Sequence, residues 1–186
     1  MTFDGAKGTR MADFSADYMT YLEGYLQRDL AHVPDRILAQ LRLTEPLDHG
    51  FEVSQFEHGL QTATRADRAG ADLDLVVAGL LHATGKSISN ANHPAIAAEM
   101  IRPWVSDEAY WVVLVHQDFQ GLHYFARMGL DPMMRTKHLG HPFYATAERF
   151  VDEWDQEAFD PDYESLPLEH FEPMVREVFG RPPRRA

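Results

Sequence analysis

The stretch that decides the fold is Leu80-Leu81-His82-Ala83-Thr84-Gly85-Lys86. It ends an apolar run that starts after Asp72, a residue type that commonly caps the start of a helix. We therefore expect a buried helix that ends near His82 and presents an imidazole at its end. Small residues one turn before that histidine would let neighbouring helices approach a central site.

The composition favours one cysteine-free globular domain with a small-molecule partner. The chain has 186 residues, 45% of them hydrophobic, and no cysteine, which excludes disulfides and thiolate metal sites. A net charge of −12 disfavours nucleic acid and anionic membranes as partners. No apolar run approaches a membrane span and no secretory signal is visible, so we expect a cytoplasmic protein. Ten histidines are the compositional hint of metal chemistry.

The hydrophobic periodicity is helical along the chain and predicts an all-α, single-domain bundle. We expect a disordered N-terminus over 1–10, the helical domain over 11–180 and a frayed basic tail over 181–186. Capping residues, prolines and glycines divide the domain further. The expected helices cover 14–26, 34–41, 55–69, 72–82, 92–102, 106–119, 142–159 and 167–180. The expected loops are 44–53 and a long connection over 121–140 that could form a lid over the site.

Histidines on four expected helices, followed by one acidic residue, form the candidate metal site. They are His58, His82, His93, His116 and Asp155. Imidazole nitrogens and carboxylate oxygens are the ligands of Fe, Mn, Zn or Ni in sites without thiolates. His116 and Asp155 fall on or beside apolar helix faces, where an unpaired polar group is costly.

A structural interpretation of each residue alone stays open. A single histidine on an apolar face is more often a hydrogen-bonded core residue than a ligand, and Asp155 could pair with Arg149 or with a backbone group. Histidines in expected loops or near helix starts suit surface or capping roles, although His123 could reach the site. This second group consists of His49, His123, His138, His141 and His170.

The order of these residues resembles the HD-domain superfamily, and most closely the branch that includes the phosphonate-cleaving diiron oxygenases. Five strings over roughly residues 48–160 carry the resemblance. They are Ser54-Gln55-Phe56-Glu57-His58 with Leu60-Gln61-Thr62-Ala63; Leu80-Leu81-His82; Asn92-His93-Pro94; Val115-His116; and Trp154-Asp155. The family signature has an aspartate directly after the histidine that His82 matches, and this chain has Ala83 there.

The resemblance implies which residues bind metal. The first metal of the family is held by ligands matching His58, His82 and Asp155, and the second by ligands matching His93 and His116. An aspartate at the position of Ala83 bridges the two. Without it, the second site keeps two neutral ligands, and the first keeps the His/His/carboxylate set of mononuclear non-haem Fe(II) enzymes. We expect Fe(II) at one site, with a metal-free protein as the alternative.

The resemblance leaves the substrate open. The phosphonate oxygenases carry a Tyr and a Glu before the first ligand, and the corresponding stretch 48–52 does not align with them, so a phosphonate is not expected. We expect His93, His116 and Lys86 to be catalytic, and His49, Glu52 and His123 to contact substrate. Lys86 could equally be an exposed cation at a helix end.

Three functions remain open from the sequence. The first is an oxygenase-like enzyme that acts on a small polar metabolite with a mononuclear metal site. The second is a metal-free descendant that acts as a lyase, an isomerase or a small-molecule binding protein. The third is a metal-dependent phosphohydrolase, which the missing bridge would weaken.

Overall fold

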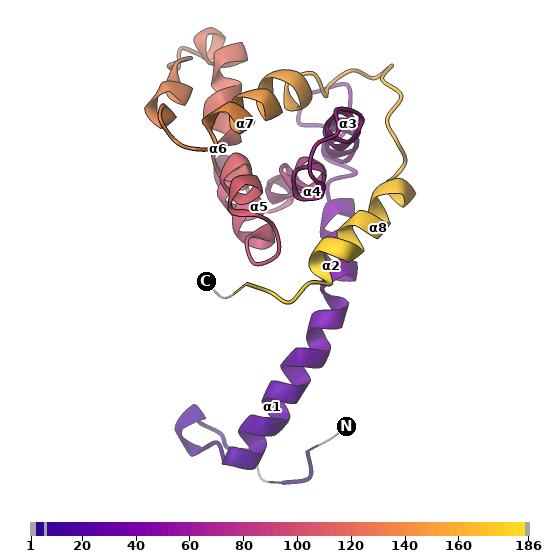
Figure 1. Cartoon of the computed structure of the whole chain (residues 1–186), viewed down its shortest axis with the longest axis vertical. Coiled ribbons are helices and arrows are strands. Elements are labelled where there is room, and N and C mark those ends of the chain that lie inside the picture. The colour runs from indigo at the N-terminus through magenta and orange to yellow at the C-terminus, as the bar shows by residue number, and fades with distance from the viewer. Residues whose placement is uncertain (1–2, 6, 185–186) are drawn as a thin grey trace.

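The structure is a computed structural model that describes residues 3–5 and 7–184. The described residues form helices and turns without a β-strand, which confirms the expected all-α bundle (Figure 1). Residues 1, 2 and 6 of the expected disordered N-terminus, and residues 185 and 186 of the expected tail, lie outside the described ranges. Within those ranges, none of the helices combines the length and apolar character that crossing a bilayer requires.

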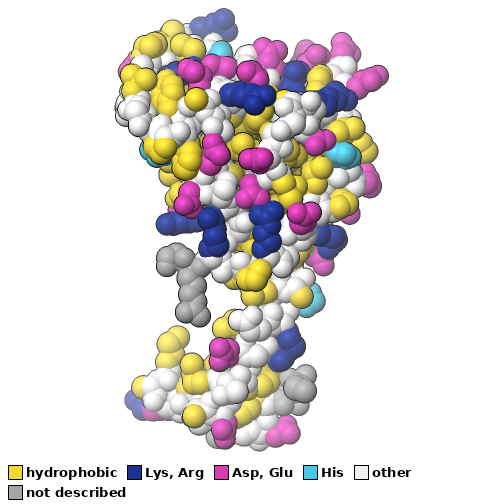
Figure 2. Space-filling view, viewed as in Figure 1, with side chains coloured by type: hydrophobic (Ala, Val, Ile, Leu, Met, Phe, Trp, Pro, Cys, Tyr) yellow, Lys and Arg dark blue, Asp and Glu magenta, His cyan; other side chains and the backbone are white. Residues whose placement is uncertain are grey.

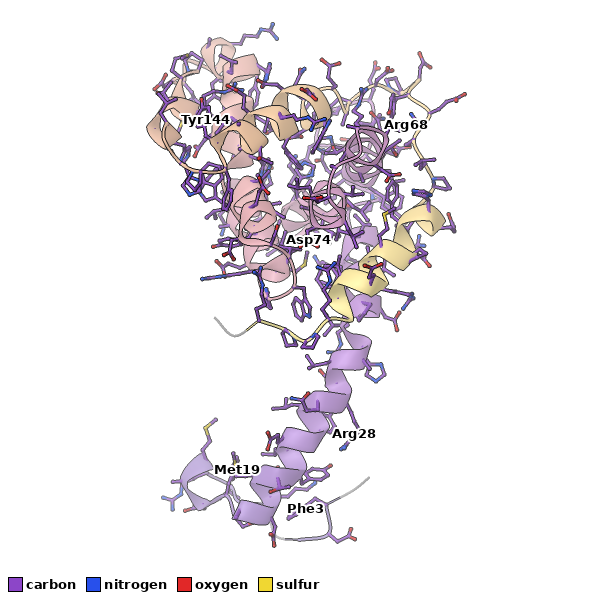
Figure 3. All side chains as sticks on the ribbon, viewed as in Figure 1. Phe3, Met19, Arg28, Arg68, Asp74 and Tyr144 are labelled. Carbon is purple, nitrogen blue, oxygen red and sulfur yellow. The ribbon has the colours of Figure 1, made fainter. Side chains whose placement is uncertain are left out.

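The first helix, α1 (Ala16–Asp29), extends away from the rest of the molecule as an arm (Figures 1 and 2). The Ser15 side chain accepts a hydrogen bond from the Tyr18 N–H and so caps its start. No residue of α1 is buried, and Met19, labelled on the arm in Figure 3, is 52% exposed. The arm therefore contributes no side chain to the core.

One half of the body consists of α2 (Val33–Arg42), α3 (Gln55–Arg68), α4 (Leu73–Leu81) and α8 (Leu168–Phe179). Helix α8 packs against α2 and α4, and α3 packs against α4 (Figure 1). A Cβ on Gly59 would lie 2.6 Å from the Leu80 carbonyl oxygen, a distance that real Cβ atoms do not adopt. Glycine at this position therefore lets α3 bring His58 close to the end of α4.

The other half consists of α5 (His93–Ile101), α6 (Asp107–Tyr124), α7 (Tyr144–Arg149) and a π-helix (Phe150–Asp155) that continues α7. A Cβ on Gly85 would collide with the carbonyl oxygen of His93, the first residue of α5. Glycine therefore allows the chain after His82 to pass directly against the start of α5. Two glycines thus set the spacing of three candidate ligands.

Two of the expected helices have wrong boundaries. Helix α6 continues to Tyr124 instead of ending near residue 119, so the expected 121–140 connection starts later. The helix expected over 142–159 begins at Tyr144, changes to π-helix at Phe150 and ends at Asp155. Single-sequence patterns do not distinguish a π-helix from an α-helix, because both bury the same residue types.

The segment 125–143 is fastened to the body by a buried arginine. Arg135 is 5% exposed and donates to both carboxylate oxygens of Asp152, at 2.6 and 3.0 Å, and to the Phe119 carbonyl oxygen. The neighbouring Asp152 raises the pKa of Arg135, so the guanidinium stays charged. Bidentate pairs of this kind are the strong class of ion pair. The expected lid is therefore anchored at its centre.

The described part of the C-terminal tail contacts the body. Arg181 pairs with Asp74 at 2.7 Å, and the Arg184 N–H donates to the Pro103 carbonyl oxygen at 2.7 Å. Asp74, labelled in Figure 3 near the start of α4, also accepts a hydrogen bond from the Ser106 N–H.

Candidate metal centre

His58, His82 and Asp155 come from three separate elements and meet in the interior. His58 lies in the first turns of α3, whose start is fixed by the capping box between Ser54 and Glu57 that the sequence predicts. His82 directly follows α4, and Asp155 is the last residue of the π-helix. All three are 0% exposed. These three residues are called the trio below.

The three ligand atoms of the trio lie within contact of one another. The Nε2 atoms of His58 and His82 are 2.9 Å apart, and each is 3.2 Å from Asp155 Oδ1. The described residues contain no other group of three or more such side chains with metal-binding spacing. The trio is therefore a group that could hold a metal ion.

The tautomer of each trio histidine follows from its other nitrogen. His58 Nδ1 lies 2.9 Å from the Ala158 carbonyl oxygen, and His82 Nδ1 lies 2.8 Å from that of Gly79. A carbonyl oxygen only accepts hydrogen bonds, so both Nδ1 atoms carry the proton. In neutral imidazoles the Nε2 atoms then hold lone pairs that face each other and the carboxylate. This backbone-anchored arrangement is typical of histidines that bind metal.

Burial favours the neutral form of the His58 imidazole. Loss of solvation lowers the pKa of His58, an effect larger than the opposing attraction of Asp155. Burial raises the pKa of Asp155, and only a protonated imidazole of His82 or His58 beside it would hold that pKa well below its usual range. Gln120 supports the ionised carboxylate by donating from Nε2 to Oδ2 at 2.7 Å. No group in the described part of the chain donates a hydrogen bond to Asp155 Oδ1.

His93 and His116 form a second, smaller group, called the pair below. Their Nε2 atoms are 3.1 Å apart, and their Nδ1 atoms donate to the carbonyl oxygens of Asn90 and Val113. Burial lowers the pKa of His93 to about 4 and that of His116 well below its ordinary value. The His116 ring lies edge-on to the His82 ring with centroids 5.0 Å apart, so the pair adjoins the trio.

A cavity of about 530 Å³ lies beside the two groups. It is lined by His49, Phe51, Lys86, Asn90, His93, Gln117, Gln120, His123, Tyr124, Phe125, Met128, Leu130, Gln156 and Phe159. The volume falls within the range of small-molecule sites. Phe159 stacks on the His58 ring at a centroid distance of 4.2 Å, so it separates the trio from the mouth of the cavity.

Only some of the residues that were expected to be catalytic or to contact substrate line the cavity. His49 and His123 line the cavity, as do Lys86 and His93 of the expected catalytic group, whereas His116 is buried behind it. Glu52 is exposed and does not line the cavity. The Lys86 ammonium donates to Gln55 Oε1 at 2.7 Å, and burial lowers its pKa, so it is not simply an exposed cation at a helix end.

Two residues of the site were missed from the sequence. Gln120 contacts Asp155, and its position one turn after His116 on the same helix was the available signal. The Ala158 carbonyl that orients His58 follows the π-helix, and no sequence pattern points to it. The suggested pairing of Asp155 with Arg149 is wrong, because Arg149 pairs with Glu153.

Comparison with known proteins does not assign the chain to a family. No protein-family model matches the chain, and no curated protein matches it. The resemblance to the HD-domain superfamily therefore stays a prediction that rests on the strings quoted above.

Proposed function

We propose that the protein is a metal-dependent enzyme with a single mononuclear site, and that the trio binds the metal. The observation that carries the proposal is the convergence of three lone pairs. Two Nε2 atoms and one carboxylate oxygen lie 2.9–3.2 Å apart in the interior without a donor among them. Buried acceptors in contact repel one another unless a cation lies between them.

A metal ion satisfies this arrangement better than a proton does. A proton binds to only one of the three atoms, and burial disfavours an imidazolium at His58. A divalent ion accepts all three lone pairs at once. The separations suit atoms that each lie about 2.1 Å from one ion at roughly right angles. This leaves further positions of the ion open for substrate.

Fe(II) is the metal we propose, and oxygenase-like oxidation of a small metabolite is the reaction class. The His/His/carboxylate set with open positions is the ligand set of non-haem Fe(II) oxygenases, and bound iron would supply O2 activation. The protein supplies the rest. Gln120 orients Asp155, backbone carbonyls orient both histidines, and Phe159 shields His58 from the cavity mouth.

The pair is proposed to contact substrate. His93 lines the cavity and is neutral near pH 7, because its pKa is about 4. Its Nε2 and that of His116 are two acceptors 3.1 Å apart. They can accept a hydrogen bond or a proton from a hydroxyl or amine of a molecule in the cavity.

Metal analysis tests the proposal. The full chain is purified without chelators, reconstituted anaerobically with Fe(II), Mn(II) or Zn(II), desalted and measured by ICP-MS. We expect about one ion per chain. Less than about 0.2 ion per chain with every metal would contradict the proposal and favour the metal-free alternative.

Activity measurements then separate the reaction classes. The iron-loaded protein is screened for O2 uptake that depends on an added small molecule. The Mn-loaded protein is screened for phosphate release from p-nitrophenyl phosphate and nucleotides. Phosphate release that tracks the metal, without O2 uptake, would replace the oxygenase proposal with the phosphohydrolase alternative.

A further inference from the structure

The mouth of the cavity exposes large apolar side chains from two loops that are far apart in the sequence. Phe51 comes from the loop before α3, and Met128 and Leu130 come from the segment after α6. They are 48%, 64% and 50% exposed. Exposed apolar side chains that gather at the rim of a cavity are typical of a ligand site.

Aromatic rings continue this surface inward. Phe51 stacks on Phe159 with centroids 4.5 Å apart, and Tyr124 and Phe125 line the same cavity in edge-on contact with each other. A molecule that reached from the rim towards the trio would therefore pass between apolar walls. Burial of an apolar group there would be favourable in proportion to its area.

Other residues of the cavity lining are polar. They include Lys86, Asn90, His93, Gln117 and Gln120. No aspartate or glutamate is among the described residues that line the cavity, although the chain carries 29 acidic residues and a net charge of −12. The Lys86 ammonium is hydrogen-bonded to an amide oxygen and forms no ion pair within residues 3–5 and 7–184. Asp155 attracts this ammonium through space but lies beyond ion-pair distance, so the half-buried charge still favours an anion in the cavity.

We propose that the cavity binds a small organic anion that carries a large apolar group. The anionic end lies towards Lys86, and the aryl or alkyl group packs against Phe51, Met128 and Leu130. If the proposed function holds, this anion is the class of molecule on which the enzyme acts. Binding itself requires no metal.

Four probes that share one carbon chain test both halves of the proposal. They are 4-phenylbutyrate, butyrate without the ring, 4-phenylbutan-1-ol without the charge, and 4-phenylbutylamine with the opposite charge. Affinities are measured by isothermal titration calorimetry on the full chain, with and without EDTA treatment. We expect 4-phenylbutyrate to bind at least about tenfold more tightly than each of the other three.

Two variants with matched controls locate the two ends of the ligand. Phe51→Ala removes the ring contact and should weaken 4-phenylbutyrate at least about fivefold while butyrate changes little. Leu139→Ala is the control, because Leu139 is 68% exposed and does not line the cavity. Lys86→Gln should bring 4-phenylbutyrate and 4-phenylbutan-1-ol to similar affinity.

Three outcomes would overturn the inference. They are equal binding of 4-phenylbutyrate and butyrate, binding of the amine as tight as that of the acid, and equal effects of Phe51→Ala and Leu139→Ala. Absence of binding by every probe would also overturn it. Because the titration is repeated on EDTA-treated protein, its failure is distinguishable from failure of the metal site, which shows in metal content alone.

Discussion

The trio and the pair are built alike and differ in one group. In both, buried histidines direct Nε2 atoms at each other from about 3 Å, and backbone carbonyls fix every Nδ1. The trio adds the Asp155 carboxylate, whereas the pair has no acidic partner of its own among the residues that the structure describes. Ala83, which is 2% exposed and directly follows His82, contributes only a methyl group.

The Asp155 carboxylate therefore decides which of the two groups could hold a cation. Two neutral nitrogens offer a divalent ion two bonds and no compensating charge. Three atoms that include an anion offer a third bond and offset the cost of burying the ion. The trio is therefore the group that could hold a metal ion, and the proposed role of the pair is to contact substrate.

The largest expected effect is that of Asp155→Ala, which reduces the trio to two neutral histidines. Metal content after Fe(II) reconstitution should fall from about one ion per chain to below about 0.2. ICP-MS measures it, with circular dichroism to verify folding. Glu153→Ala, which removes an exposed acid on the same segment, should leave the metal content unchanged. Full metal content in folded Asp155→Ala would exclude the trio as the site.

The reverse change, Ala83→Asp, tests whether a carboxylate turns the pair into a second site. In the family that the sequence resembles, an aspartate here bridges two metals. We expect metal content to rise from about one to about two ions per chain, and metal-free protein to lose stability because a carboxylate is buried. Ala83→Asn has nearly the same shape without the charge and should stay near one. An unchanged stoichiometry in Ala83→Asp would count against the resemblance at this position.

A smaller effect is expected from Gln120→Leu, which removes the hydrogen bond that orients Asp155. Metal affinity should fall by about 10–100-fold, the usual consequence of losing such support. Competition with a chelator of known affinity measures it. Gln117→Leu is the matched control on the same helix, since Gln117 lines the cavity and has no hydrogen bond to Asp155. Equal losses in both variants would show that Gln120 has no special role.

The smallest effect on metal binding is expected from His93→Ala, which removes half of the pair. The metal content should stay at about one ion per chain, and the affinity should change by less than about threefold. His82→Ala, measured in parallel, should abolish binding. If both variants lose the metal, the pair and the trio act as one site, which would contradict the claim that the trio alone holds the ion.

The all-α architecture and most helix starts were predictable from local signals. The capping box of Ser54 and Glu57, the Pro94 at the start of α5 and the apolar run before His82 act within a few residues. The end of α6 was not predictable in this way. Residues 121–124 begin a stretch rich in Gly, His and Met that predicts a connection, but the helix continues through them because Gln120 and His123 contact the π-helix.

The sequence by itself determined which residues are candidate ligands, because residue type and order along the helices are local properties. The resemblance to the HD-domain superfamily also predicts that Ala83 occupies the position of the bridging aspartate of that family. Only the tertiary structure decided that His58, His82 and Asp155 meet while His93 and His116 form a separate pair. Those distances depend on close helix approach at Gly59 and Gly85 and on the π-helix that turns Asp155 inward. The electrostatic need for a cation arises only once three lone pairs share one buried point.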